Sequence, residues 1–500
     1  MSLWGPERFF LVIRNAICTY SLLGRTGNIS FPKGGMVKLI WSCKQLFGVR
    51  AAIKIESLDY CDILPLAVLL EKRPGFFRKG RKMKRYGILV GLACIFGGIV
   101  AAFGAGASDE LEPEAIKAKI QEHRMGDLVV KAGPGAEVHV EQLRHEFWFG
   151  AALSSGAFSG RMSAEDQRKY EETFLANFNA AVTENALKWH DMEREPGRVN
   201  YATVDAILAW TDRHEIPLRG HNIFWGIPNR VQQWLKAMDD ETLRETLKAR
   251  ALDIGRRYRG RFAEYDLNNE MIHANYYEDR LGPGITKQMA DWVKQADPGA
   301  RLFFNDYDIL TGNRLDDYIK HIRGLLEQGA PMAGIGVQGH LHGETFDPKA
   351  LQNALNELAK IGLPIRITEF NMPGQRSVFT KEWKLTPEQE QAKAKAITDY
   401  YRICFAHPAV EGILMWGFWE DANWIRQSSL YRRDWTPTPA AGAYRDLIFK
   451  EWWTDSKVKA DASGQCRIRA FYGKYAVTCG AEKKEVLLSK DKGQATVSFD

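Results

Sequence analysis

Cysteine is scarce in this sequence, with seven residues among 500, and no two have the close spacing of a zinc site or a redox motif. A glycine-rich phosphate loop followed by Lys and Ser or Thr is also absent, which disfavours phosphoryl transfer. HLHGE (340–344) contains two histidines and a glutamate, but it is not the H-E-x-x-H pattern of a metal-binding helix. A metal held by His340 and His342 therefore remains only as an alternative.

A basic excess is absent from most of the chain. Of 68 basic and 62 acidic residues, 16 and 5 fall within residues 1–107, which leaves 52 and 57 for residues 108–500. The first part has a net charge of +11 and the remainder has a net charge of −5. Nucleic-acid binding requires a basic face, so we expect no nucleic-acid partner.

One apolar run lies near the start of the chain. It occupies residues 86–103, follows a basic MKR that begins at Met83, and precedes an A-x-A sequence that ends at Ala107. These three features are typical of an export signal, so we predict that residues 83–107 are cleaved and that the protein is secreted or periplasmic. The run approaches the ~20 residues of a membrane span, so a membrane partner is expected only if the run stays uncleaved as an anchor.

Residues 1–82 precede this signal, although export signals normally begin a chain. The segment shows no sustained period of 2 or 3.6, so it predicts neither strands nor helices. We therefore predict that translation starts at Met83 and that residues 1–82 are an upstream segment outside the mature protein.

Strands and helices alternate from residue 147 to about residue 450. Asp347-Pro348 begins one predicted helix, and Thr386 with Gln389 forms a capping box before another. Strands that alternate with helices imply a parallel sheet, and eight units over roughly 300 residues suit a (β/α)8 TIM barrel. We predict this α/β barrel at 147–450. The eight strand candidates are FWFGAALS, AAVTENALKW, IPLRGHNIFW, EYDLNNE, RLFFNDYDI, GIGVQGHL, PIRITEF and GILMWGFW.

Small β-rich modules flank the barrel at 108–146 and 451–500. The segment 128–146 alternates apolar and polar residues about a Gly-Pro-Gly turn, which predicts a hairpin. The C-terminal segment alternates likewise and has few aromatic residues, so we interpret it as an antiparallel packing module rather than a sugar-binding one. Cys466 and Cys479 lie in neighbouring strand-like runs and could pair in an oxidising compartment.

Reactive side chains of such barrels lie at the carboxyl ends of the strands, where the loops converge. A single Glu, Trp or His at a strand end is more often structural than functional. The occurrence of many such residues at the ends of separate strands is what indicates an active site. In chain order, the set comprises Glu184, Asn185, Lys188, His221, Trp225, Asn269, Glu270, Asn305, Tyr307, Gln338, His340, Glu369, Trp416 and Trp424.

Two carboxyl groups within this set favour glycosidic cleavage. Glu270 and Glu369 end the fourth and seventh strand candidates. One carboxyl must be protonated to help the leaving oxygen depart, and the other must be ionised to attack the anomeric carbon. Amides and Lys188 can bond to sugar hydroxyls, and indole faces can cover the apolar faces of pyranose rings.

The motifs around these residues resemble glycoside hydrolase family ten, the endo-β-1,4-xylanases, over essentially residues 147–450. TENALKW, RGHNIFW and YDLNNE are similar to the family's E-N-x-x-K, R-G-H-x-x-x-W and W-D-x-x-N-E segments. FFNDY, GIGVQGHL, ITEF and MWGFWEDANW resemble its later motifs. The resemblance implies an endo-acting, retaining enzyme that cleaves β-1,4-xylan by double displacement, with a β-glycan as its partner and no cofactor.

The resemblance also implies a role for each matched position. Glu270 would be the acid/base and Glu369 the nucleophile, to which His340 would bond. Asn305 and Tyr307 would lie nearer the leaving-group side. The sugars on the non-reducing side of the bond would be held by Asn185, Lys188, His221, Trp225, Asn269 and Gln338. Glu184 would also bind the substrate, and Trp416 and Trp424 would wall the cleft.

Two positions depart from the family pattern. Gly226 stands where a His usually follows the matched Trp, which opens space or removes a donor. Asn371 stands where Asp is common, two residues after the nucleophile, and we expect it to bond to His340 without supplying a charge. Gly226 could therefore alter the length of glycan chain that the enzyme prefers, and Asn371 could alter how activity depends on pH.

Two other functions stay open on the sequence. One is a catalytically silent glycan-binding protein on the same barrel, against which the presence of both Glu270 and Glu369 argues. The other is a metal-dependent hydrolase that uses His340 and His342, and insensitivity to chelators would remove it.

Overall fold

The computed structural model describes residues 109–341, 343, 345–375 and 384–499, together with five strands before residue 56. The chain forms two compact units, Met1–Gly97 and Gly98–Asp500. In the first unit, β1 (Arg8–Ile13) pairs with β2 (Ala16–Ser21), and β4 (Met36–Ile40) pairs with β3 (Thr26–Ser30) and β5 (Lys54–Ile55), all antiparallel. The sequence did not predict these strands.

The predicted export signal at 83–107 lies outside the described residues. Among the helices that the structure describes, none is both long enough and apolar enough to cross a membrane.

A closed parallel barrel forms the body of the second unit. Neighbouring strands are parallel, β16 pairs with β8, and β10 pairs with β12, so the sheet closes on itself. β10 and β11 are two parts of one strand position, which gives eight positions and confirms the predicted barrel. The strands are β8 (Trp148–Ala152), β9 (Ala180–Val182), β10 (Leu218–Gly220), β11 (Phe224–Trp225), β12 (Glu264–Asn269), β13 (Leu302–Asp306), β14 (Met332–Val337), β15 (Ile365–Phe370) and β16 (Val410–Met415).

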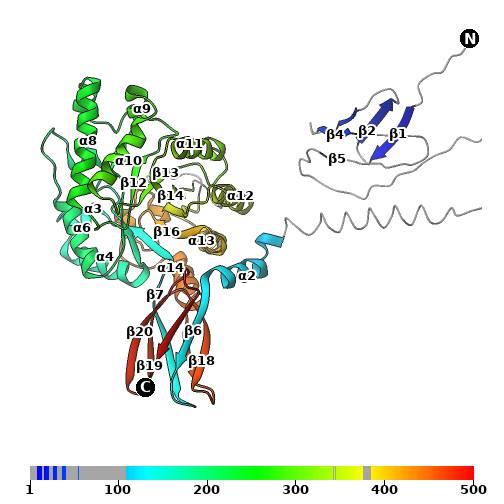
Figure 1. Ribbon diagram of the computed structural model, residues 1–500, viewed down its shortest axis with the longest axis vertical. Coiled ribbons are helices and arrows are strands. Elements are labelled where there is room, and N and C mark those ends of the chain that lie inside the picture. Colours follow the sequence, from blue (N-terminus) through cyan, green and yellow to red (C-terminus); the bar gives the residue numbers. More distant parts are fainter. Residues whose placement is uncertain are drawn as a thin grey trace, which may run out of the picture. The chain divides into compact units, whose positions relative to one another are not determined.

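Helices follow the strands and cover the outside of the barrel (Figure 1). Both predicted caps are present, because Asp347 accepts hydrogen bonds from two backbone N–H groups and Thr386 forms a capping box with Gln389. The main helices are α4 (Ala164–Asn177), α6 (Ala202–Arg213), α8 (Asp240–Arg257), α10 (Ile285–Ala296), α11 (Leu315–Glu327), α12 (Pro348–Ala359), α13 (Pro387–Ala406) and α14 (Pro439–Asp446). Short helices are α3 (Ser155–Phe158), α5 (Trp189–Met192), α7 (Gln233–Lys236) and α9 (Tyr276–Leu281).

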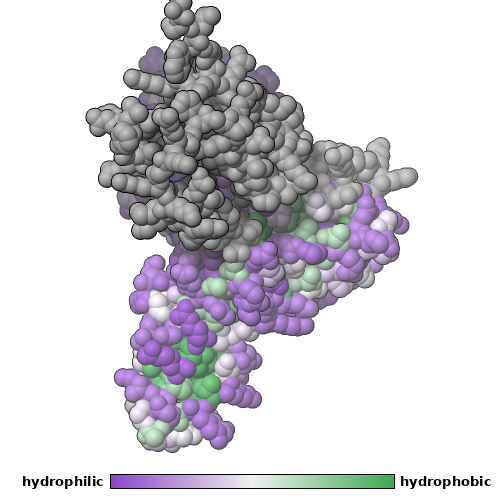
Figure 2. Space-filling model, turned by 90° about the vertical axis from the view of Figure 1, so that its right-hand side faces the viewer, coloured by the Kyte–Doolittle hydropathy of each residue, from purple (hydrophilic) through white to green (hydrophobic). Residues whose placement is uncertain are grey.

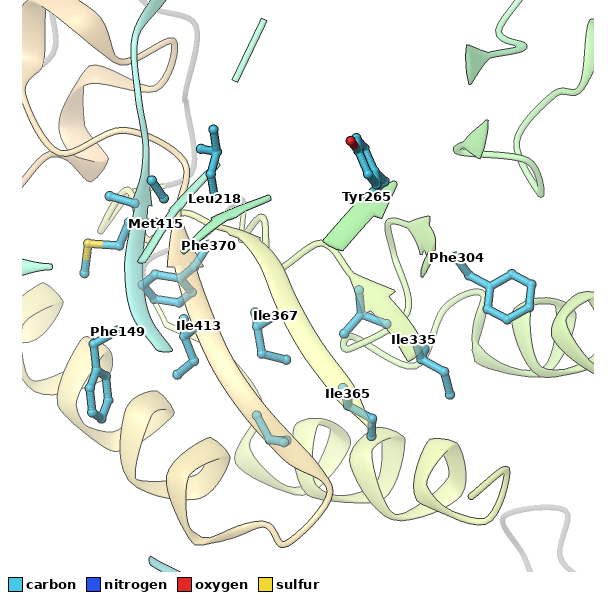
Figure 3. Close-up of a cluster of buried hydrophobic side chains, with 14 of the residues drawn as sticks. Phe149, Leu218, Tyr265, Phe304, Ile335, Ile365, Ile367, Phe370, Ile413 and Met415 are labelled. Atoms are coloured by element: carbon cyan, nitrogen blue, oxygen red, sulfur yellow. The ribbon is translucent and has the colours of Figure 1, made fainter. Parts of the chain in front are cut away.

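Apolar side chains fill the layer between strands and helices. Ile365 and Ile367 of β15 lie beside Ile413 of β16 in this layer, and all three are fully buried (Figure 3). Side chains alternate along a strand, so the residue between the first two points toward the barrel axis. That residue, Arg366, donates from Nε and Nη2 to the two carboxylate oxygens of Glu264, at 3.0 Å each. The interior of the barrel therefore holds buried charged groups beside a smaller apolar cluster that includes Trp148 and Leu414.

A two-sheet β-sandwich lies at one end of the barrel (Figure 1). One sheet has β6 (Met125–Lys131) between β18 (Gln465–Phe471) and β21 (Gln494–Ser498). The other has the order β17 (Asp455–Lys459), β7 (Glu137–His145), β19 (Gly473–Cys479) and β20 (Glu482–Leu488). The two modules that were predicted on either side of the barrel therefore form one sandwich.

The hairpin predicted at 128–146 is wrong. β6 and β7 belong to different sheets, and each pairs with strands from the C-terminal segment. A lone hairpin is marginal in water, whereas two facing sheets bury the apolar side of every strand. Cys466 and Cys479 lie on strands of different sheets, and both are free thiols. Figure 2 shows hydrophobic residues in the middle of the β-sandwich with hydrophilic residues around them.

The sandwich faces the amino-terminal end of the barrel. Trp148 begins β8 and Pro217 directly precedes β10. Both line a hollow of about 300 Å³ together with Gly473 and Lys474 of the sandwich. The carboxyl ends of the strands, where the predicted site residues lie, are thus at the opposite end.

Arg124 joins the segment before the barrel to the barrel itself. It ends α2 (Pro113–Arg124), is 5% exposed, and donates to the carbonyl oxygens of Phe405 (2.6 Å), His407 (2.6 Å) and Val410 (2.7 Å). Two of these carbonyls belong to the end of α13, where helical carbonyls lack partners and carry partial negative charge. Burial lowers the pKa of Arg124 to about 10, so the guanidinium stays charged at neutral pH.

Replacing Arg124 by leucine should destabilise the protein strongly. Three buried carbonyls would lose a charged donor, although that of His407 still accepts from the backbone N–H of Val410 at 3.2 Å. Each group left unsatisfied costs about 1–3 kcal/mol. We expect the free energy of unfolding, measured by urea denaturation, to fall by about 3 kcal/mol or more. Arg467→Leu is the matched control, because that side chain is 65% exposed and its ion pair with Asp127 should contribute less than about 1 kcal/mol. Equal losses in both variants would contradict the proposed role of Arg124.

Candidate active site

The predicted site residues gather at the carboxyl-terminal mouth of the barrel. Glu369 lies within β15, and Glu270 directly follows β12. Trp424 is exposed, whereas the rest of the set is buried or half-buried. The others are Glu184, Asn185 and Lys188 after β9, His221 after β10, Trp225 in β11, Asn269 in β12, Asn305 in β13, Tyr307 after β13, Gln338 and His340 after β14, and Trp416 after β16.

Glu369 is surrounded by hydrogen-bond donors and cationic groups. Asn305 Nδ2 donates to Oε1 at 3.0 Å, His340 Nε2 lies 3.1 Å from Oε2, and His221 Nδ1 lies 3.9 Å from Oε1. Burial alone would raise the pKa of Glu369, but His221, His340 and Lys188 outweigh burial and lower the pKa to about 2. Glu369 is therefore ionised throughout the ordinary pH range.

Glu270 has a different environment. Trp225 Nε1 donates to Oε2 at 2.8 Å, and Gln338 Nε2 donates to Oε1 at 3.0 Å. Burial raises the pKa of Glu270 and the charge of Glu369 raises it further, while the two donors offset only part of this effect. Its φ of 62° lies in the left-handed region, where non-glycine residues are strained and often functional.

The mouth thus holds two carboxyl groups with opposite shifts in pKa. One is an anion at any working pH, and the other keeps its proton to a higher pH than an ordinary glutamate. Two such groups with divergent pKa values are the usual basis of an acid/base assignment. The arrangement can supply a proton and a nucleophilic anion at the same time.

A line of buried charges lies beneath Glu369, and the sequence analysis missed it. His221 Nδ1 is 2.8 Å from Asp266 Oδ2, and Arg219 donates to both Asp266 and Glu264. Burial disfavours the charged form of Arg219, but the carboxylates of Asp266 and Glu264 outweigh burial and raise its pKa. The signal was available, because Glu264 and Asp266 alternate with apolar residues in a strand that is buried on both faces.

A lysine and two indoles form another part of the mouth, close to both carboxyl groups. Lys188 Nζ donates to Asn185 Oδ1 at 2.8 Å and lies 4.7 Å and 5.8 Å from the ring centroids of Trp225 and Trp416. Burial lowers the pKa of Lys188, and the carboxylates of Glu369 and its neighbours oppose that effect. These contacts hold the ammonium group near the ionised carboxylate.

A hollow of about 560 Å³ opens beside this lysine. Glu184, Asn185, Arg161 and Trp424 are among the residues that line it. Burial raises the pKa of Glu184 to about 7, although Lys188 opposes the shift. The lining therefore offers amide, hydroxyl and carboxyl groups together with one exposed indole.

The structure shows the local contacts of Gly226 and Asn371, the two positions that depart from the family pattern. A Cβ at Gly226 would lie 2.8 Å from Asn275 Oδ1 and 3.3 Å from Tyr277 Cδ2. The prediction that Gly226 opens space is therefore wrong, because the side chain of Asn275, which caps α9, already fills the space. The predicted bond of Asn371 is confirmed, since its Oδ1 lies 2.7 Å from His340 Nδ1 and also accepts from Trp424 Nε1 at 3.3 Å.

The metal alternative gains no support from the described residues. His342 lies outside them, and within them no three His, Cys, Asp or Glu side chains are grouped in a way that could hold a metal ion.

The fold and the site define a (β/α)8-barrel protein with paired carboxyl groups in its mouth. A family model described as glycosyl hydrolase family 10 matches residues 140–447, and the chain belongs to this family. It is 34% identical over 373 residues to endo-1,4-beta-xylanase 1 of Arabidopsis thaliana, covering 72% of this chain and 37% of that protein. It is 33% identical over 366 residues to anti-sigma-I factor RsgI6 of Acetivibrio thermocellus, covering 72% and 45%.

The chain therefore spans less than half the length of these relatives. Among solved structures, native xylanase 10B from Thermotoga maritima aligns with a TM-score of 0.55 at 24% identity, over 61% of this chain and 96% of that one. At this identity the likeness supports the fold alone.

Replacing Gln338 by leucine should raise the pKa of Glu270. The amide stabilises the ionised carboxyl, and a lost donor favours the protonated form. We expect an upward shift of about one pH unit in an NMR titration with 13C-labelled glutamate, with Glu369 unmoved. Gln167→Leu is the control, because that amide donates to Glu171 at 3.0 Å on an outer helix. A downward shift of Glu270, or none, would contradict the assignment.

Proposed function

We propose that this protein is an endo-acting glycoside hydrolase that cleaves β-1,4-xylan with retention of configuration. Glu270 is the acid/base and Glu369 is the nucleophile. The observation that supports the proposal most directly is the contrast between them: Glu369 has a pKa of about 2, and the pKa of Glu270 is raised in the same mouth. Retaining glycosidases require one protonated and one ionised carboxyl.

In the first step, the Glu369 carboxylate attacks the anomeric carbon while Glu270 gives its proton to the leaving oxygen. The glycosidic bond breaks, a covalent glycosyl ester forms on Glu369, and Glu270 becomes an anion. In the second step, Glu270 takes a proton from water as the water oxygen attacks the anomeric carbon and frees Glu369. Two displacements at one carbon restore its original configuration.

The surrounding side chains suit these steps. Asn305 donates to Glu369 and also to Asn269 Oδ1 at 2.8 Å, which fixes one oxygen of the nucleophile. Gln338 and Trp225 hold the two oxygens of Glu270. The retaining assignment predicts carboxyl groups about 5–5.5 Å apart, against ~6.5–9.5 Å for inversion.

The choice of xylan rests on the family and on its members. Several relatives are named endo-1,4-beta-xylanases, and a similar structure from Thermotoga petrophila is a xylanase in complex with xylobiose. The polar hollow at Glu184 and Asn185, with the indole of Trp424 at its wall, offers donors and an apolar face to the sugars.

A second candidate is a glycan-binding protein without catalysis. One relative carries the name anti-sigma-I factor rather than xylanase, so a family barrel also occurs in a protein named for regulation. On this reading the same residues bind xylan but leave it intact.

Activity on three polysaccharides separates these functions. Incubation with xylan, glucomannan and carboxymethyl cellulose should release reducing ends from xylan first, and proton NMR should show the β-anomer as the initial product. Glu270→Gln and Glu369→Gln should each lower kcat/KM on xylan by about 10³-fold or more. Glu195→Gln, at a 68% exposed side chain, is the control. An initial α-anomer would exclude retention, and binding without release would favour the second candidate.

We also propose that the protein is exported, supported by the basic, apolar and A-x-A pattern at 83–107. N-terminal sequencing of the mature protein should give a start near Ser108. A mature chain that still begins at Met1 would contradict both export by cleavage and the late translation start.

A further inference from the structure

A histidine that the sequence analysis did not select lies three residues after Glu270. The ring of His273 stacks on the ring of Tyr307, with centroids 3.5 Å apart and planes 8° from parallel. Its backbone N–H donates to the carbonyl oxygen of Glu270 at 3.2 Å. A backbone hydrogen bond therefore ties the histidine to the residue proposed as acid/base.

Asp306 fixes this histidine. It is fully buried, accepts backbone N–H bonds from Ile272 (2.9 Å) and Tyr307 (3.0 Å), and has Oδ1 2.7 Å from His273 Nδ1. A carboxylate only accepts, so Nδ1 must hold a hydrogen and the ring cannot rotate without breaking this bond. Nε2 is then the remaining polar atom of the ring.

Nε2 is available for a ligand. No side chain or backbone group in the described part of the chain hydrogen-bonds to it, and the His273 side chain is 14% exposed at the mouth. Tyr307 is also partly exposed. The stacked pair thus presents one polar atom and part of an aromatic surface to the mouth.

The position of the pair relates it to the leaving group. The polar hollow lies over the ends of β8, β9 and β16, whereas His273 and Tyr307 lie over β12 and β13, which face β8 and β16 across the barrel. A glycan that starts in the hollow and passes Glu369 reaches Glu270 and then this pair. The family resemblance implies that residues such as Asn185 hold the sugars on the non-reducing side, which puts those sugars at the hollow. On that assignment, the sugar beyond Glu270 receives the proton and leaves.

We propose that His273 is a specificity-determining residue that hydrogen-bonds through Nε2 to a hydroxyl of the leaving sugar. The proposal rests on the proposed function. A hydroxyl both donates and accepts, so it matches Nε2 whether or not the ring carries a second proton. An acidic substituent fits less well, because the charges of three acidic side chains, Glu270, Asp306 and Asp308, act on Tyr307. Arg314 opposes them.

The test compares two substrates that share the bound sugars but differ in the leaving group. Xylotetraose has a sugar as its leaving group, whereas 4-nitrophenyl β-xylobioside has an aryl group without hydroxyls to match. His273→Asn keeps an amide near the position of Nδ1 for Asp306 but has nothing at the position of Nε2. We expect kcat/KM to fall about tenfold on xylotetraose, the worth of one hydrogen bond, and to change less than about twofold on the aryl substrate.

Two further variants make the result decisive. His139→Asn is the matched control, because that histidine lies 2.7 Å from Asp455 in the sandwich, and neither substrate should be affected. His273→Gln carries a longer amide that reaches toward the Nε2 position, so its loss on xylotetraose should stay within about threefold; this variant decides the question if the Asn variant fails to fold.

The outcomes are distinct. Equal losses on both substrates would make His273 structural and overturn the inference, as would unchanged activity on xylotetraose. A wild-type protein inactive on both substrates would overturn the proposed function itself. The inference is supported if His273→Asn lowers kcat/KM on xylotetraose but not on the aryl substrate, and if His273→Gln retains most of the activity on xylotetraose.

Discussion

A line of buried ion pairs along the barrel axis organises the site above it. Eight strands leave an interior that side chains must fill, and here a line of charged groups fills part of it beside an apolar cluster. Each charge is paired, and removing one partner of a buried pair typically costs about 3–5 kcal/mol. The last member, His221, lies 3.9 Å from the carboxylate of Glu369, so the packing of the interior also sets the charge beside the nucleophile. In order, the members are Arg366, Glu264, Arg219, Asp266 and His221.

The two carboxyl groups differ because their neighbours come from different strands. Glu369 faces histidines and a lysine, which favour its anion. Glu270 is buried near the negative charge of Glu369, and both effects favour its protonated form. The donors of Trp225 and Gln338 oppose this shift only in part. Glycosidic cleavage requires this inequality, and no property of either residue alone would produce it.

The sandwich stabilises the end of the barrel at which no chemistry is proposed. Its strands come from both ends of the second unit, and Arg124 binds carbonyls at the end of α13. This contact secures the amino-terminal end of the barrel and leaves the mouth open to a polymer. The location supports the interpretation of the C-terminal segment as a packing module.

The sequence alone determined the eight barrel strands, the helix caps and most residues of the mouth, because periodicity, capping and strand ends are local features. The tertiary structure decided the partners. β6 and β7 lie in different sheets, and each pairs with strands more than three hundred residues away in the chain. A local sequence pattern does not contain such distant partners. Asn275 fills the space at Gly226, and Asp306 fixes His273, through contacts that no local pattern contains. A side chain's pKa and free polar atoms depend on neighbours in space, and only the folded chain brings those neighbours together.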